Sequence, residues 1–259
     1  MTWAQKVVLP KLGAVAIVVV LWELALLRWQ KTNALPTPAA VLQALLHQVQ
    51  SLDFYQAILI TMSRAVVGYL VALVLGAAIA LVMAVAPVVR SAVGALITGL
   101  QTLPSISWFP LALLLFSGSE TAILFVVILG ATPSIANGVI SGIDTVPVPQ
   151  VQAARVLGAR GVYLYRRVIL PGAMPQVLAG LKQGWAFAWR SLIAGELLVI
   201  VAGRPSLGVK LDLARHLHDA ATILALLIVL LTIGILVDFG FGRLESRVRR
   251  QRGLLRHAL

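Results

Sequence analysis

The feature that most constrains this chain is the length of its uncharged segments. Four stretches without Asp, Glu, Lys or Arg run through residues 65–89, 91–119, 121–143 and 220–237. A helix needs about 20 apolar residues to cross a bilayer, and helices buried in soluble proteins are rarely so uniformly apolar. The sequence therefore predicts a membrane protein built of spanning helices.

Composition excludes several other classes of protein. Hydrophobic residues make up 60% of the 259 residues and charged residues only 12%, whereas a soluble domain carries about 25% charged residues. A soluble enzyme and a disordered chain are therefore both excluded. The net charge of +12 would suggest nucleic-acid binding in a polar chain, but here we expect no nucleic-acid partner. The absence of cysteine excludes disulfides and thiolate chemistry.

We predict an all-α, polytopic bundle that forms a single domain over residues 1–259. Two of its helices are interrupted by charges, the first by Glu23 and the fifth by Lys182, Arg190 and Glu196. The six predicted spans cover residues 12–28, 65–86, 92–116, 122–141, 177–201 and 220–241.

The basic residues predict which side of the membrane each loop occupies. With six spans, both termini, the 87–91 turn and the 142–176 loop share one side. That side holds thirteen of the 21 basic residues, and the other side holds six. Cytoplasmic segments carry an excess of Lys and Arg, so we expect both termini and the 142–176 loop in the cytoplasm.

Two segments outside the spans have helical patterns. In 38–50, apolar residues recur at helical spacing behind Pro38, which predicts a helix that lies on the outer leaflet. The 142–176 loop is unusually long for a compact membrane domain, and such loops tend to be functional. We predict a helix over 150–157 that stops at Gly158, and a second helix over 162–169 that ends at Pro171.

The loop also carries a motif with defined spacing. It contains Gln152-Ala153-Ala154, then Gly158 after three residues, then Val168-Ile169-Leu170-Pro171. This pattern resembles the EAA loop of ABC importer permeases. The segments 102–110 and 194–197 resemble the branch of that family that handles nitrate, sulfonates and taurine, and the likeness extends from about Leu35 to Gly208.

The resemblance implies that the loop passes the motion of an ATPase to the membrane helices. The residues that would make this contact are Gln152, Ala153, Ala154, Gly158, Leu170 and Pro171. Gln152 stands where the family usually has Glu, so a charge-assisted contact from this position would be weaker. A plain alternative is a basic helix lying on anionic lipid, but the motif spacing favours coupling.

The partners follow from what the chain contains and lacks. No Gly-x-x-x-x-Gly-Lys-Ser/Thr run occurs, so we expect no ATPase site on this chain and no cofactor bound by it. ATP and Mg²⁺ would lie on two separate ATP-binding subunits. The resemblance further implies an external solute-binding protein, a second permease copy in a homodimer, and a place in the inner membrane of a prokaryote.

Polar residues within the predicted spans are candidates for the translocation pathway, because each is costly at membrane depth. Arg190 and Gln183 are seven residues apart and share a helix face. Arg190 could contact a small anion, or it could form a structural ion pair with Glu196 or Glu23. The other candidates are Glu196 itself, Pro104, Ser105 and Ser107, which interrupt the third span, and Asn137 in the fourth.

The sequence therefore predicts the permease subunit of an ATP-driven importer for a small solute such as a sulfonate or nitrate. It predicts no covalent catalysis and no metal site. An ATP-independent channel or carrier is the alternative. An intramembrane enzyme is less favoured, because the histidines lie outside the predicted spans.

Overall fold

The computed structural model describes residues 13, 16–17, 19–24, 26 and 35–251. Within these residues the chain is helical and contains no strand, which confirms the predicted fold class. In chain order the elements are α2 (Pro38–Val49), α3 (Leu52–Val85), α4 (Pro87–Thr102), η1 (Ser105–Trp108), α5 (Phe109–Phe116), α6 (Glu120–Asp144), α7 (Val148–Val156), α8 (Gly161–Leu164), the π-helical turn η2 (Tyr165–Ile169), α9 (Leu170–Leu198), α10 (Leu207–His216) and α11 (Ala220–Gln251).

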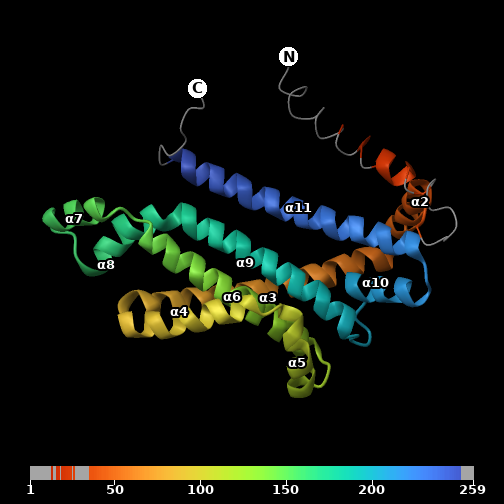
Figure 1. The fold of residues 1–259 in the computed structure, drawn as a ribbon, viewed down its shortest axis with the longest axis horizontal. Coiled ribbons are helices and arrows are strands. Elements are labelled where there is room, and N and C mark those ends of the chain that lie inside the picture. Colours follow the sequence, from red (N-terminus) through yellow and green to blue (C-terminus); the bar gives the residue numbers. More distant parts are fainter. Residues whose placement is uncertain (1–12, 14–15, 18, 25, 27–34, 252–259) are drawn as a thin grey trace, which may run out of the picture.

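The long helices α3, α6, α9 and α11 form the body of the molecule (Figure 1). The short helices α7 and α8 project at one end of it, here called the α7 end, and α2 and α10 lie at the opposite end, here called the α10 end. This arrangement places the motif-bearing loop far from the segment that follows α9.

Glycines allow the central helices to pack at backbone distance. A Cβ atom on Gly138 of α6 would lie 2.3 Å from the Cα atom of Gly180 of α9. A Cβ atom on Gly76 of α3 would lie 2.9 Å from the Ile135 side chain of α6. These small residues bring α6 against both α3 and α9, as is common in membrane bundles, so α6 forms the centre of the structure.

The described residues contain three helices that are long and apolar enough to cross a membrane by themselves, namely α3, α6 and Ala220–Val248 of α11. A fourth crossing arises if α4 and the segment from Ser105 to Phe116 count as one broken span. Polar residues in α9 lower its mean hydropathy, although its 29 residues are long enough to cross. The first predicted span lies mostly outside the described residues. The count of six therefore stays a prediction.

Helix α3 extends well beyond the second predicted span. Helix α3 starts at Leu52 rather than at residue 65, because Arg64 is buried inside the helix and does not mark its end. The fifth span also differs, since α9 runs from Leu170 to Leu198 rather than over 177–201.

The third predicted span is broken, as its prolines indicated. The two halves of the 88–116 segment meet at an angle of 100°. Pro104 precedes the short helix η1, and Pro110 lies in the first turn of α5, where its missing N–H costs nothing. The predicted 92–116 helix is therefore two helices joined at a sharp turn.

The ends of the other helices follow ordinary capping rules. The Thr37 hydroxyl accepts a hydrogen bond from Ala40 N at 3.2 Å, which starts α2 where the pattern predicted a helix. Asp219 precedes α11 and accepts a bond from Thr222 N at 3.0 Å. The Thr222 hydroxyl and backbone N–H lower the pKa of the Asp219 carboxyl below its usual value.

Candidate functional site

The 142–176 loop begins as predicted. Helix α7 covers Val148–Val156, and Gly158 follows it with φ +87°. Gly158 N donates to Arg155 O at 3.0 Å, and Ala159 N donates to Ala154 O at 2.9 Å. These bonds satisfy carbonyls at the end of the helix, and the left-handed backbone suits glycine. Gly158 therefore ends the first helix of the loop, as its place in the motif predicted.

The second half of the loop differs from the prediction. Helix α8 continues through the π-helical turn η2 directly into α9, so no helix ends at Pro171. Pro171 instead lies in the first turn of α9, where proline is tolerated. The loop is thus joined to α9 without an intervening non-helical segment.

The motif residues differ in how far they are exposed. Gln152, Ala153, Gly158 and Leu170 are exposed, while Ala154 and Pro171 are half-buried. Ala154 packs on a small core around Leu164 and Ile169, which holds α7 against η2. Ala154 therefore stabilises the loop, and Gln152 and Ala153 are the members of the triplet that a partner could reach.

The loop also presents an apolar surface that motif reading missed. The exposed fractions are 87% for both Val156 and Leu157, 82% for Val162 and 62% for Tyr163. These four residues, here called the loop patch, flank Gly158 in the sequence. The signal was available in the sequence, because they are apolar residues placed among four arginines.

Two of the pathway candidates lie on one exposed side of α9. Gln183 and Arg190 are both exposed. Asn137 of α6 is exposed as well, and it adjoins Gly138, which packs against Gly180 of α9. The structure therefore brings Asn137 and Gln183 to neighbouring parts of the α6–α9 pair. Arg190 lies two-thirds along α9 rather than midway, because the helix begins at Leu170.

Arg190 has no carboxylate partner in the described part of the chain. Its Nε donates to Ala186 O at 3.0 Å, and its guanidinium lies 5.0 Å from the centre of the Phe187 ring. It also lines an apolar groove of about 560 Å³ between α9 and α11. The nearby acidic residue in that groove, Asp238, pairs with Lys182 at 2.8 Å. The structural ion pair between Arg190 and Glu196 does not form.

The residues at the break in the third predicted span differ in how exposed they are. Pro104 and Ser107 are exposed, whereas Ser105 is half-buried. A Cβ atom on Gly130 of α6 would lie 3.4 Å from the Ser105 Cβ atom. The break therefore rests on α6 through Ser105 and leaves Pro104 and Ser107 accessible.

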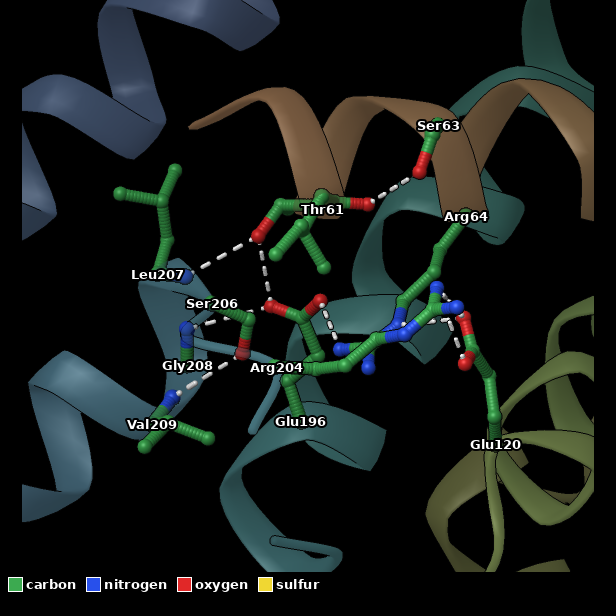
Figure 2. Close-up of polar contacts among 11 residues, drawn as sticks. Thr61, Ser63, Arg64, Glu120, Glu196, Arg204, Ser206, Leu207, Gly208 and Val209 are labelled. Atoms are coloured by element: carbon green, nitrogen blue, oxygen red, sulfur yellow. Dashed lines mark hydrogen bonds and ion pairs between the residues drawn. The ribbon is translucent and has the colours of Figure 1, made fainter. Parts of the chain in front are cut away.

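Glu196 belongs to a buried ion network at the α10 end (Figure 2). Its carboxylate accepts bonds from Arg64 Nη1 at 2.9 Å, from Thr61 Oγ1 at 2.9 Å and from Gly208 N at 3.1 Å. Arg64 also donates through Nε to Glu120 at 3.2 Å. Glu196 is fully buried and Arg64 is 2% exposed. This network joins α3, α6, α9 and α10.

The network also completes the start of α10. Leu207 N donates to Thr61 Oγ1 at 3.0 Å, and Val209 N donates to Ser206 Oγ at 3.3 Å. Together with Gly208 N, these are free N–H groups of a first helical turn, which need partners when buried. A Cβ atom on Gly208 would lie 2.3 Å from the Glu196 Cβ atom, so only glycine fits there.

Sequence reasoning identified Glu196 but not its partners. The predicted span over residues 65–86 leaves Arg64 just outside the membrane, because a charge next to an apolar run usually marks the end of a span. The pairs that neutralise it come from residues 56 and 132 positions away, a separation that no local pattern reveals.

With this geometry in place, the chain can be compared with known proteins. It matches the family described as "Binding-protein-dependent transport system inner membrane component" over residues 68–250. The chain belongs to this family.

Named relatives and a solved structure agree with that membership. The permease is 27% identical to the taurine transport system permease protein TauC of Escherichia coli (strain K12), over 92% of this chain and 87% of TauC. It is 31% identical to the putative aliphatic sulfonates transport permease protein SsuC of the same organism, over 88% of this chain and 86% of SsuC. Its fold matches a chain of the MetNI methionine ABC transporter in an inward-facing conformation, with TM-score 0.64, 20% identity, and coverage of 76% and 96%.

These findings confirm an ABC importer permease in the nitrate, sulfonate and taurine branch, located in a membrane. Such a permease works with an ATPase and a solute-binding protein. Among the residues described here, no cluster of His, Cys, Asp or Glu could hold a metal ion.

Proposed function

We propose that two copies of this permease enclose a path for a small anion, with both termini and α7 on the cytoplasmic side. We choose an anion as the solute because of the surroundings of Arg190. This guanidinium lies within a membrane-length helix and has no carboxylate partner among the described residues. A buried or membrane-embedded charge needs a partner. An anionic solute would be a transient partner for Arg190 during transport. The names of the relatives, which concern taurine and aliphatic sulfonates, agree with this choice.

The α7 end supports coupling to a separate ATPase. The loop patch exposes four large apolar side chains, and Arg155 and Arg160 lie beside them. Exposed apolar clusters with a polar rim are typical of protein–protein contacts. We infer that the loop patch, together with Gln152 and Ala153, contacts the ATP-binding subunits, where ATP and Mg²⁺ bind. Gln152 contributes hydrogen bonds and no ion pair.

The solute is tested by uptake into proteoliposomes that contain the permease, its ATPase and its binding protein. We expect ATP-dependent uptake of at least one of taurine, a short alkanesulfonate or nitrate, each of which offers a singly charged oxyanion group, and no uptake of solutes of the same size that lack an anionic group. Uptake that persists without ATP would instead indicate an ATP-independent carrier, and exclusive uptake of a solute without an anionic group would contradict the recognition of an anion.

Coupling is tested by replacing Gly158. The G158P variant is expected to lose the co-purifying ATPase, because proline cannot adopt φ +87°. G158N is expected to retain the ATPase, since asparagine tolerates the left-handed region. Pull-down from membranes measures both.

A matched control for this test lies at the α10 end. Gly203 also has positive φ, at +72°, and has no atom near its missing Cβ. G203P is expected to retain the ATPase. Equal ATPase binding by G158P and by the unmodified chain would contradict the coupling role of the loop.

A further inference from the structure

Helix α9 carries a row of polar side chains that extends the two candidates already described. Gln176, Gln183 and Arg190 are exposed and follow one another at intervals of seven residues. Seven residues are nearly two turns of a helix, so their side chains share one face, with about 10 Å between successive members. These three residues are here called the α9 row.

The neighbours of α9 define which face this is. Gly180 and Gly184 pack against α6, and Lys182 pairs with Asp238 of α11. Tyr69 of α3 donates to Leu181 O at 2.9 Å. The α9 row lies between these contacts on an exposed side of the helix, and Arg190 at one end of the row borders the groove between α9 and α11.

A polar row of this kind does not suit contact with lipid. Hydrocarbon offers no hydrogen-bond partner to an amide, and a cation near the centre of a span costs about 2.5–3.5 kcal/mol on insertion scales. The exposed surface of α3 differs from this row, since it carries apolar residues such as Leu59, Val74 and Leu81. The α9 row is thus suited to a water-filled path.

The charge of the side chains in the row also changes along the helix. Arg190 lies eight residues from the end of α9 at Leu198, Gln183 lies near its middle, and Gln176 lies six residues from its start at Leu170. The only charge of the row is therefore nearest to the α10 end, and the two members nearer to the α7 end are neutral hydrogen-bond donors. Asn137 of α6 adds a third neutral amide near Gln183.

We propose that the α9 row is a graded anion path in which Arg190 selects a singly charged oxyanion and Gln183 and Gln176 pass it toward the α7 end. This proposal rests on the proposed function. The Arg190 guanidinium can donate two parallel bonds to two oxygens of a sulfonate or a nitrate. Amides then hold the anion through neutral hydrogen bonds, which are weaker. A path needs binding strong enough for entry and weak enough for release, and this order of residues provides both.

The first test measures access to the row without measuring transport. Because the chain contains no cysteine, Q176C and Q183C each carry a single thiol. Both are expected to react with a charged, membrane-impermeant thiol reagent, and excess taurine or nitrate is expected to slow that reaction. The control V74C, at a 68% exposed apolar position of α3, is expected to stay unreactive. Unreactive thiols at both row positions, with reactive thiols elsewhere in the same preparation, would overturn the proposal.

The second test uses uptake in the reconstituted importer. R190Q is expected to lower kcat/KM for anion uptake about tenfold or more, because it removes one charge-assisted contact. Q183R is expected to lower the apparent KM and to slow turnover, because a second cation retains the anion. ATPase co-purification and size-exclusion profiles show that each variant is folded, and R190K is expected to recover part of the uptake.

The matched control concerns Lys182, which is adjacent to Gln183 and lies on another face of α9. Lys182 pairs with Asp238 of α11, which borders the same groove as Arg190. The double variant K182Q/D238N removes both charges of this pair and leaves no free carboxylate beside Arg190, so it is expected to change uptake less than twofold. Unchanged uptake by R190Q, or an equal loss in K182Q/D238N, would overturn the graded path. If the unmodified importer takes up no anion, the proposed function itself fails, and the two failures are thereby distinguished.

Discussion

Replacing Arg64 with methionine is expected to destabilise the permease by about 3–5 kcal/mol, because the substitution leaves a buried carboxylate without its partner. Glu196 is fully buried and would keep only the bonds from Thr61 and Gly208. Thermal unfolding in detergent, with the yield of monodisperse protein as a second readout, measures the effect. Helix α10 is expected to lose its structure first, because the Glu196 carboxylate binds a backbone N–H group of its first turn.

Two further variants separate charge from packing in this prediction. In the double variant R64M/E196Q no isolated charge stays fully buried, so part of the lost stability is expected to return. The control R204Q removes a 54% exposed arginine whose distance to Glu120 is 3.3 Å, and it is expected to cost less than about 1 kcal/mol. A single R64M variant as stable as the unmodified protein would contradict the importance of the network.

Replacing Gly138 with valine is expected to destabilise the permease by about 3 kcal/mol or more, which exceeds the usual cost of overpacking. The added Cβ atom would lie 2.3 Å from the Gly180 Cα atom. The obstacle is backbone rather than a flexible side chain, so α6 and α9 have to separate. Stability in detergent and the yield of folded protein measure this effect.

A control variant in α11 is expected to change stability in the opposite direction. Gly240 is helical and has no atom within 4 Å of its missing Cβ atom. G240A is expected to leave stability unchanged or to raise it by about 1 kcal/mol, because alanine favours a helix. If G138V and G240A behave alike, the close approach of α6 and α9 does not hold the bundle together.

How far the sequence predicts the structure depends on whether each signal is local. Helix α2 and the stop at Gly158 were predicted because capping and turn conformation depend on a few adjacent residues. The break near Pro104 was predicted for the same reason, but its 100° angle depends on how Ser105 meets Gly130 of α6. The start of α3 at Leu52 could not be predicted, because Arg64 is neutralised by two carboxylates that are distant in the sequence.

The candidate site follows the same division. The shared face of Gln183 and Arg190 was predicted from their spacing, and Gln176 stands at the same interval, so it could have been added. The partner of Glu196 and the exposure of the loop patch depend on tertiary packing. Neither could be derived from periodicity alone.

The glycine contacts between α6 and α9 have a consequence for how the protein changes shape. Close contacts recur from Gly142 with Val177 to Gly195 with Ile123, so the two helices touch along most of a length of about 40 Å. One end of this pair continues into the 142–176 loop, and the other end carries Glu196 and its network. Pro133 of α6 and Pro175 of α9 each remove a helical hydrogen bond within this length, but close contacts on both sides of each proline hold the two helices together. The two ends of the permease are therefore expected to switch in a single concerted step, rather than one after the other.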